Sequence, residues 1–476
     1  MLILLQSRAF PQNLSLYNAI QFALKNNKTI MYSSEENYLS AGAQLNLEYA
    51  IYNPSLNAQA SFSQSLTKTQ TFMPLTGYEL SQYNRYRQII PDLSLQQTFL
   101  TPLGSTLTLS GGVQTLASGV SSFSFQTNPT LGLSYQQPLS LQGIASGHID
   151  KELAEETYRQ SGLSYELQKE QLVISVIQSY FQLWQAEQSV EQSKRDKESA
   201  ERILKIADLK LNQGSIAEFE ELNLRVQYNL AEDNLLQAQN ALKTQTISFM
   251  QLLGANIDST VTLEQNIKID SINFTLQEAT QRAMNNRLEI KQSEISLAGD
   301  SLSLTQTSSS LSPVLQLNAS YNFNSNLEPY FFQSFDMPNY GWNILGTISI
   351  PIYDGGRTSY RTEISERNIA IQKENLSLLK QDIAIDIETQ YRTLMLDVKR
   401  FKSLSFSLKA ASEALNIAEL RFNSGQISST EIENVRDRYN AAKNALDGAK
   451  ISYIIERANL AKATGELFKW IESMKE

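Results

Sequence analysis

The positions of the prolines constrain the fold of this 476-residue chain more than any other feature of its sequence. None of the 11 prolines falls within 139–312 or within 352–476. Proline removes a backbone donor and clashes with the preceding helical turn, so it interrupts helix interiors. The two proline-free blocks therefore predict long helices. The blocks that contain proline predict a different kind of structure.

The composition excludes several kinds of site. Because the chain has no cysteine, it has no disulfide, no Cys-ligated metal, no thiol nucleophile and no cysteine to carry an N-terminal lipid. The single histidine, His148, is expected to be a junction residue rather than a ligand. A net charge of -9 argues against a nucleic-acid partner. The chain has no apolar run of about 18 residues, so no transmembrane helix is predicted. A transmembrane barrel strand needs only ~10 alternating residues, so a membrane barrel stays possible.

The N-terminal segment supports two interpretations. Residues 1–5 are apolar, and Arg8 follows them. The segment is too short for a complete secretory signal, which needs a basic start and a longer apolar core. It is therefore either the remnant of such a signal or an ordinary terminus.

The chain contains two related halves. Residues 16–30 match residues 276–290 at an offset of 260. A longer match, with thirteen identities, has an offset of 211 and covers the C-terminal part of each half. Self-similarity of this kind indicates a duplicated structural unit. We predict two tandem repeats, 14–254 and 274–465.

Each repeat contains a heptad pattern that predicts long, packed helices. Apolar residues step by four and three along 224–252 and again along 435–463. A sustained period of 3.5 residues is the signature of coiled-coil packing. The chain turns back at Gly214 and at Gly425, a residue type that commonly ends helices. The two predicted helical hairpins cover 150–254 and 357–465.

The blocks that contain proline, 54–139 and 313–351, carry the two-residue period of β-strands. Apolar residues alternate there with Asn, Gln, Ser and Thr, and aromatic residues cluster at the ends. This combination is typical of transmembrane barrel strands. A soluble sandwich shows the same alternation, but two strands per repeat are too few for one. We predict about four strands per protomer, with an additional hairpin at 92–115 that either joins the barrel wall or projects from it.

A share of four strands cannot close a barrel. Open sheet edges are not tolerated in lipid, and a barrel needs at least about eight strands, so the chain must oligomerise. Three copies would supply about twelve strands, and the same threefold arrangement would form a tube from the helical hairpins. The predicted fold class is therefore an α+β membrane protein. It consists of a trimeric β-barrel continuous with a long coiled-coil α-helical barrel.

This combination closely resembles the TolC-like family of outer-membrane efflux and secretion channels, over residues 14–466. The resemblance rests on the hairpin tips, 211–216 and 421–427, and on the Pro-Ile-Tyr-Asp-Gly-Gly-Arg block at 351–357. It implies a homotrimer whose β-barrel crosses the outer membrane, in contact with its lipid, and whose helical barrel extends into the periplasm. It also implies an exit duct for a tripartite efflux pump or a type I secretion system. A periplasmic adaptor would connect this duct to an inner-membrane pump of the RND, ABC or MFS type.

The resemblance further implies a periplasmic gate lined by acidic side chains. Glu220 and Glu431 each lie six residues after a tip glycine, where the family usually has Asp, and Glu221 and Glu433 are nearby. Carboxylates from three chains would form a ring like those of other cation-favouring pores. The alternative is that these residues are solvated acids at helix N-termini, where the helix dipole favours negative charge.

The hairpin tips resemble the surface on which members of this family dock their adaptors. The alternative is that these residues simply make the turn. The candidate docking residues are Asn212, Gly214, Ser215, Asn423, Gly425 and Gln426.

No motif indicates an enzyme. The paired glycines lack the spacing of phosphate-binding loops, and adjacent acids on a helix do not share a face. We therefore expect no catalysis and no cofactor. Two other functions remain open. A non-conducting coiled-coil scaffold of the cell envelope would have no need of amphipathic strands, and a porin-like uptake barrel would have no need of long helices.

Overall fold

The computed structural model divides the chain into two compact units. The helical unit comprises Met1–Tyr38, Ser161–Glu294 and Glu374–Glu476, and the sheet unit comprises Leu39–Gln160 and Ile295–Lys373. The boundary between them falls inside helices, so each unit is built from several chain segments. The structure describes residues 13–27, 31–72, 79–99, 104–118, 124–139, 141–257, 261–264, 274–324, 339–424 and 426–475.

The elements follow the predicted order of short helix, strands and long helical hairpin in both halves of the chain. Helix α3 begins at Leu141 rather than at the predicted position 150, because no proline follows Pro138 to delay it. The helices are α1 (Leu16–Asn26), α2 (Ser33–Ala50), α3 (Leu141–Asn212), α4 (Glu218–Leu253), α5 (Leu276–Asn286), α6 (Leu288–Ser309), α7 (Arg357–Asn423), α8 (Ser429–Ala463) and α9 (Leu467–Ser473). The strands are β1 (Asn13–Leu14), β2 (Ser55–Phe72), β3 (Glu79–Thr98), β4 (Thr106–Ser118), β5 (Ser124–Pro138), β6 (Thr262–Leu263), β7 (Val314–Asn324) and β8 (Asn339–Ser349).

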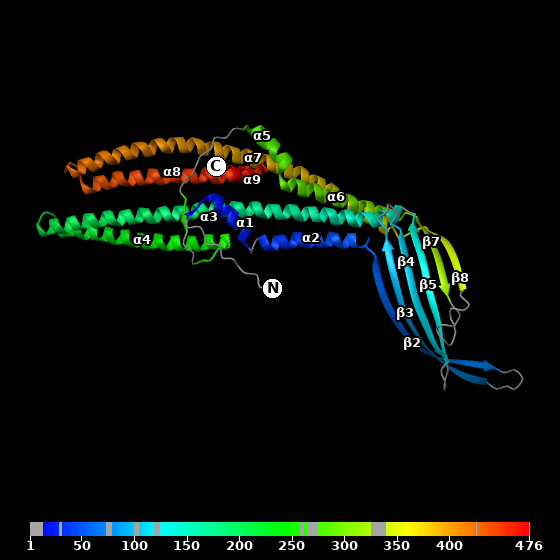
Figure 1. The fold of residues 1–476 in the computed structure, drawn as a ribbon. Coiled ribbons are helices and arrows are strands. Elements are labelled where there is room, and N and C mark those ends of the chain that lie inside the picture. Colours follow the sequence, from blue (N-terminus) through cyan, green and yellow to red (C-terminus); the bar gives the residue numbers. More distant parts are fainter. Residues whose placement is uncertain are drawn as a thin grey trace. The chain divides into compact units, whose positions relative to one another are not determined.

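Two long antiparallel hairpins dominate the helical unit. Helix α4 lies beside α3, and α8 lies beside α7 (Figure 1). The heptad positions along 224–252 and 435–463 are all buried or half-buried, which agrees with the prediction that they form the packing faces. In the described ranges, none of the helices carries a stretch that is both long and apolar enough to cross a bilayer.

Tyr180 on α3 anchors the short parallel strand pair β1–β6 to the core of the helical unit. Its ring is fully buried and packs edge-on against Phe181 and Phe249. Its hydroxyl lies within hydrogen-bond distance of two carbonyl oxygens, at 3.0 Å from Leu14 and 2.9 Å from Glu264. Because a buried hydroxyl needs such partners, Tyr180 holds both strands against α3.

The C-terminal end of each hairpin closes against a short helix in the same way. Gly254 and Gly465 follow α4 and α8 with φ of 70° and 69°. A Cβ atom on Gly254 would lie 2.3 Å from the carbonyl oxygen of Asn26, and one on Gly465 would lie 2.7 Å from the Cβ of Asn286. The two glycines are 211 residues apart and the two asparagines 260 apart, the offsets of the predicted repeats.

Glu170 carries a carboxyl group buried inside the helical unit. Only 6% of the residue is exposed, and burial raises the pKa of its carboxyl from 4.5 to about 7. The positive charges of Lys462 and Arg287 partly oppose this rise in pKa, whereas the charges of Glu289 and Glu166 add to it. At neutral pH the folded protein therefore keeps a partly protonated acid in its core.

Replacing Glu170 by glutamine is expected to stabilise the protein at high pH and to have little effect at low pH. The folded state binds the proton more tightly than the unfolded state, so wild-type stability falls as the pH rises from 4.5 to about 7. The whole loss is about 3 kcal/mol, and Glu170→Gln removes it. Thermal unfolding of both proteins across this range measures the effect.

The matched control is Glu166→Gln on the same helix. The Glu166 side chain is 43% exposed and its carboxylate lies 2.6 Å from Lys169 Nζ. A surface pair of this kind contributes about 1 kcal/mol or less. The Glu166 charge is the smallest of the causes that raise the pKa of Glu170, so the control should show only a minor part of the pH-dependent gain. A melting-temperature difference for Glu170→Gln that stays constant with pH would contradict the prediction.

Among its described residues, the sheet unit contains one antiparallel sheet of six strands, in the order β2-β3-β4-β5-β7-β8. The four strands predicted from the alternating blocks are thus accompanied by two more, β3 and β4. The hairpin expected at 92–115 joins the sheet, since β3 pairs with β2 and β4 pairs with β5 along most of their lengths. Backbone pairing on both sides of β3 and β4 makes them part of the wall.

The register gives this sheet two chemically distinct faces. The apolar face carries rows such as Leu95, Leu109 and Leu133, which lie opposite one another across β3, β4 and β5. The polar face carries rows such as Ser94 and Ser110. Large side chains of the apolar face are exposed within the chain, among them Trp342 at 75%, Leu56 at 66% and Ile348 at 63%. An apolar surface of this extent requires a cover outside the protomer.

Candidate gate and docking tips

The first hairpin tip, between α3 and α4, is built around Gly214. The Ser215 N–H donates to the Lys210 carbonyl oxygen and the Gly214 N–H donates to that of Leu211, both at 2.8 Å. This is the Schellman arrangement, and it requires the φ of 66° that Gly214 adopts. Asn212, Gly214 and Ser215 are all exposed, so the predicted docking residues of this tip are available to a partner.

The second tip, between α7 and α8, repeats the main hydrogen bond of the first. The Gln426 N–H donates to the Arg421 carbonyl oxygen at 2.8 Å, 211 residues after the bond from Ser215. Asn423 is the last residue of α7, and Gln426 is exposed. Gly425 lies outside the described residues, as does the side chain of Asn423.

Glu220 and Glu431 occupy equivalent positions in the first turns of α4 and α8. Each is the third helical residue after its N-cap, which is Ala217 in α4 and Ser428 in α8. The Glu431 N–H donates to Ser428 Oγ at 3.2 Å. Both glutamates are exposed. A carboxylate at this position benefits from the helix dipole, and its exposure also leaves it free to face a pore.

Glu221 lies in a different environment from its neighbour Glu220. It is only 4% exposed, and Arg225 Nη2 lies 2.5 Å from Glu221 Oε1. The same guanidinium lies 3.9 Å from Asp208 on α3. The residue 211 positions after Glu221 is Ile432, which is also buried. This position of the helix thus faces the interior of each hairpin, and the Glu221 carboxylate pairs with Arg225 within the protomer.

Glu433 is half-buried on α8. Burial raises the pKa of its carboxyl, and the nearby charge of Asp437 raises it further, whereas Arg436 opposes the rise. Glu433 therefore differs from the exposed pair Glu220 and Glu431. Of the four predicted gate residues, two are exposed and two lie partly or fully inside the helical packing.

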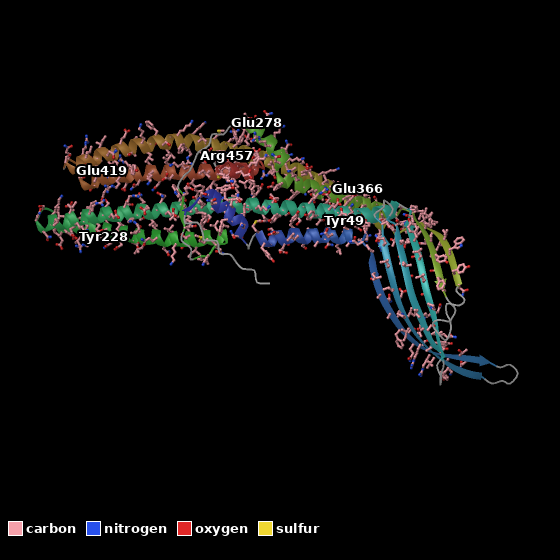
Figure 2. The ribbon with its side chains drawn as sticks, in the orientation of Figure 1. Tyr49, Tyr228, Glu278, Glu366, Glu419 and Arg457 are labelled. Atoms are coloured by element: carbon pink, nitrogen blue, oxygen red, sulfur yellow. The ribbon has the colours of Figure 1, made fainter. Side chains whose placement is uncertain are left out.

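Arg436 makes a contact between the two hairpins that sequence reasoning missed. Its Nη1 donates to Ser199 Oγ on α3 at 2.5 Å, and its Nη2 lies 4.0 Å from Glu419 on α7. Glu419 and Tyr228 are both labelled in Figure 2. Within the first hairpin, Lys197 Nζ on α3 lies 5.8 Å from the centroid of the Tyr228 ring on α4, a cation–π contact.

The repeat could have predicted that Arg436 faces Glu419. Arg225 occupies the equivalent position in the first hairpin, and it faces Asp208, the counterpart of Glu419. The sequence does not show that Arg436 also reaches α3. Its bond to Ser199 connects residues 237 positions apart. Any movement of the second hairpin away from the first would break this bond.

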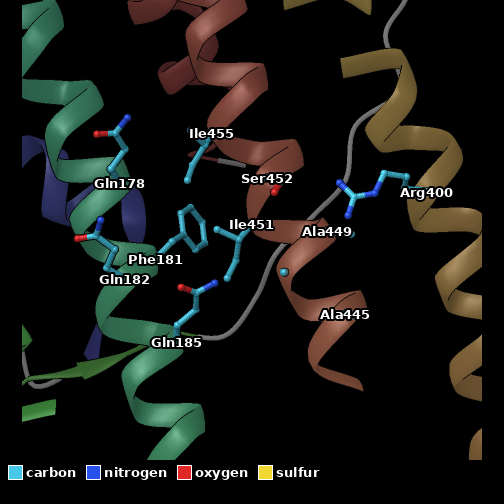
Figure 3. Close-up of a pocket in the computed structure, with 11 residues that line it drawn as sticks. Gln178, Phe181, Gln182, Gln185, Arg400, Ala445, Ala449, Ile451, Ser452 and Ile455 are labelled. Atoms are coloured by element: carbon cyan, nitrogen blue, oxygen red, sulfur yellow. The ribbon is translucent and has the colours of Figure 1, made fainter. Parts of the chain in front are cut away.

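A groove of about 680 Å³ lies between α3, α7 and α8 within the helical unit. Figure 3 shows Gln178, Gln182 and Gln185 along its α3 side and Arg400 on α7. Small residues on α8 leave the space open, and none of the predicted gate or tip residues lines it.

The described residues offer no cluster of metal ligands. They contain no group of three His, Cys, Asp or Glu side chains that could hold a metal ion. His148 lies within α3, after the strands, and its side chain is outside the described residues.

The fold and the two hairpin tips define the class of protein. The profile of the outer membrane efflux protein family matches residues 101–255 and 279–466. The chain therefore belongs to the outer membrane efflux protein family, a family of channels rather than of enzymes. This confirms the resemblance drawn from the hairpin tips and from the block at 351–357.

Individual relatives agree with this assignment. The chain is 23% identical to the outer membrane protein TolC of Escherichia coli K12 over 380 residues, which cover 77% of this chain and 74% of that protein. It is 22% identical to TolC of Vibrio cholerae over 340 residues, which cover 71% of this chain and 76% of that protein.

Solved structures share the fold. The CmeC outer membrane channel of Campylobacter jejuni matches with a TM-score of 0.67 and 18% identity, over 96% of this chain and 88% of that one. The open state of the MtrE outer membrane channel of Neisseria gonorrhoeae matches with a TM-score of 0.65 and 16% identity, over 95% of this chain and 89% of that one.

Proposed function

We propose that this protein is a passive exit duct of the outer membrane, formed by three copies of the chain. It would serve a tripartite efflux pump or a type I secretion system and extend into the periplasm. The single observation that carries the proposal is the two-faced sheet joined by continuous chain to two long helical hairpins. Membership of the outer membrane efflux protein family supports it.

The sheet supports a barrel wider than the one expected from four strands. Strands β2 and β8 are the edges of the sheet within the chain, and open edges are not tolerated in lipid. Three copies joined edge to edge would give a barrel of about 18 strands, a size that leaves an aqueous channel. The apolar face would contact lipid and the polar face would line the channel.

The hairpins support a helical tube built from two tandem repeats. Matching turns follow α3 and α7, and matching glycines follow α4 and α8. A tube of this kind would be closed near the tips by the exposed Glu220 and Glu431 of three chains. Opening it would require the second hairpin to move against contacts such as that between Arg436 and Ser199.

The partners follow from the same arrangement. The exposed tips would receive a periplasmic adaptor, with Asn212, Gly214 and Ser215 on one hairpin and Gln426 on the other. The adaptor would connect the duct to an inner-membrane pump of the RND, ABC or MFS type. Asn423 and Gly425 are included in the proposed docking surface because of their positions in the sequence.

Replacing Glu431 by glutamine is expected to weaken block of the channel by divalent cations. The change removes three carboxylates from the proposed ring while keeping their size. The half-blocking concentration should rise by about tenfold, equivalent to 1.4 kcal/mol of cation affinity. Planar-bilayer conductance with added divalent cations measures this.

Glu366→Gln is the matched control, because Glu366 is an exposed acid on α7 far along the sequence from the tip. It should leave block unchanged. If Glu431→Gln also leaves block unchanged, the gate assignment is wrong, and the helix-dipole role remains the explanation for this glutamate.

The alternative of a non-conducting scaffold makes a different prediction. A scaffold would be soluble in water without detergent and would carry no current in a bilayer. The exposed apolar face of the sheet favours the duct. Extraction with and without detergent, followed by conductance measurement, distinguishes the two functions.

A further inference from the structure

The polar face of the sheet carries almost no charge. By the register, this face receives alternate residues of the six strands, and most of them are Asn, Gln, Ser, Thr or Gly. In the six strands as the structure describes them, Asp92 on β3 is the single charged residue of this face. Whatever moves along the polar face therefore meets one kind of charge.

Asp92 lies near the middle of the sheet. It is opposite Gln59 on β2 and Gly112 on β4, and Gly112 is in turn opposite Thr130 on β5. Gly112 is the central residue of β4 (Thr106–Ser118). In the proposed duct, Asp92 would thus lie part-way along the channel and not at its mouth.

Gly112 leaves space for the Asp92 side chain. A Cβ atom on Gly112 would lie 3.0 Å from Asp92 Oδ1 and 3.4 Å from Thr130 Oγ1. The carboxylate and the hydroxyl approach this position from the strands on either side of β4, and no side chain of β4 separates them. The half-buried Asp92 side chain therefore lies over bare backbone on the polar face.

No basic side chain neutralises this carboxylate. The basic residues of the six strands are Lys68, Arg85 and Arg87, and the register places all three on the apolar face. The residues of the sheet unit that lie outside the described ranges include no Lys or Arg. Among the described side chains, the Asp92 carboxylate has no ionic or hydrogen-bonding partner. Its negative charge is therefore available to solutes at the polar face.

We propose that Asp92 makes the channel formed by the sheet prefer cationic solutes over anionic ones. The inference rests on the proposed function, in which three copies form the barrel and the polar face lines the channel. Three Asp92 carboxylates would form a ring of negative charge, like those of other cation-favouring pores. Asp92 belongs to the sheet unit and the proposed gate glutamates belong to the helical unit, so each ring can be removed without the other.

The expected preference is modest and depends on salt. About 18 strands that are ~4.8 Å apart and tilted by about 40° give a barrel with a backbone radius of about 18 Å. The Debye length is about 30 Å at 0.01 M salt and about 3 Å at 1 M. The field of the ring should therefore reach across the channel at low salt and be screened at high salt.

The test measures the K⁺/Cl⁻ permeability ratio of the full-length protein in a planar bilayer with a gradient of KCl. Glu220 and Glu431 are replaced by glutamine in every variant, so that their charges do not contribute. Asp92→Asn should lower the ratio by about threefold near 0.01 M salt, the effect of three screened charges at the estimated radius. At 1 M salt the ratio should not change. The conservative variant Asp92→Glu should keep the preference.

A second measurement uses the absence of cysteine from the chain. Asp92→Cys introduces a single thiol, which can be coupled to a methanethiosulfonate reagent that carries either a sulfonate or a trimethylammonium group. The sulfonate should restore the preference for cations, and the trimethylammonium group should reverse it. The matched control is Leu93→Cys on the apolar face, where neither charged reagent should change the ratio.

Three outcomes would overturn the inference. They are an unchanged ratio in Asp92→Asn at low salt, equal effects of the two reagents on Asp92→Cys, and effects on Leu93→Cys as large as those on Asp92→Cys. Each of these outcomes requires a protein that conducts, so it would contradict only the role of Asp92. A protein that carries no current, with or without these substitutions, would contradict the proposed duct itself.

Discussion

Replacing Gly254 by alanine is expected to destabilise the helical unit by roughly 2–5 kcal/mol. Gly254 has φ of 70°, a conformation that costs an L side chain about 1–2 kcal/mol. The new Cβ would also lie 2.3 Å from the carbonyl oxygen of Asn26 and 2.8 Å from its carbonyl carbon. These are backbone atoms of α1, so the whole helix end must move.

That movement would also break a bond between the two segments. Asn27 Nδ2 donates to the carbonyl oxygen of Leu252, two residues before the glycine, at 2.7 Å. Urea unfolding of the purified protein, followed by far-UV circular dichroism, measures the loss. Gly465→Ala should have a similar effect, because its Cβ would lie 3.1 Å from the carbonyl oxygen of Asn286.

Gly214→Ala separates backbone strain from steric clash. Gly214 has nearly the same φ, 66°, but a Cβ placed there would meet nothing within 4 Å. This variant should lose only the cost of the backbone conformation, about 1–2 kcal/mol. Equal losses for Gly254→Ala and Gly214→Ala would show that the approach of Asn26 to Gly254 has no energetic consequence.

Periodic features of this chain could be predicted from sequence, because one face of each element is mostly apolar. The heptad positions of α4 and α8 are buried or half-buried as expected. The alternation in β2 and β7 likewise gives the sheet its two faces. Periodicity reports which face of an element packs.

Periodicity does not report which elements pair. Leucines at every second position, Leu93 and Leu95 in one segment and Leu107 and Leu109 in the next, predict strands. This pattern does not say whether the strands join the sheet. That depends on backbone bonds from β3 to β2 and from β4 to β5, which any side chain permits. The sequence therefore leaves a sheet of four strands and a sheet of six as alternatives, and the backbone pairing decides for six.

The gate residues illustrate a second limit. Glu220 and Glu221 are the same residue type at adjacent positions, yet Glu220 is exposed and Glu221 is buried beside Arg225. Successive helical residues point in different directions, so only one of the two can face outward from the hairpin. The counterpart of Glu221 in the second repeat, Ile432, was a signal that this position faces inward.

Replacing Leu133 by arginine is expected to reduce the stability of the membrane-inserted protein by about 2–4 kcal/mol, the cost of Arg on a lipid-facing strand near the bilayer midplane. Leu133 lies on β5 between Leu109 and Tyr321, on the apolar face. Because its strand is paired on both sides within the chain, the substitution acts on the face of the sheet and not on its edge. Urea titration of folding into lipid vesicles measures the loss.

Ser134→Arg is the matched control, one residue further along the same strand. Ser134 lies between Thr108 and Ser320 on the polar face, so its arginine would extend into the proposed aqueous channel. It should cost little stability, and its added positive charge should lower the conductance for cations. If both variants fold into vesicles equally well, the apolar face does not contact lipid. The sheet would then need a protein cover, as the scaffold alternative requires.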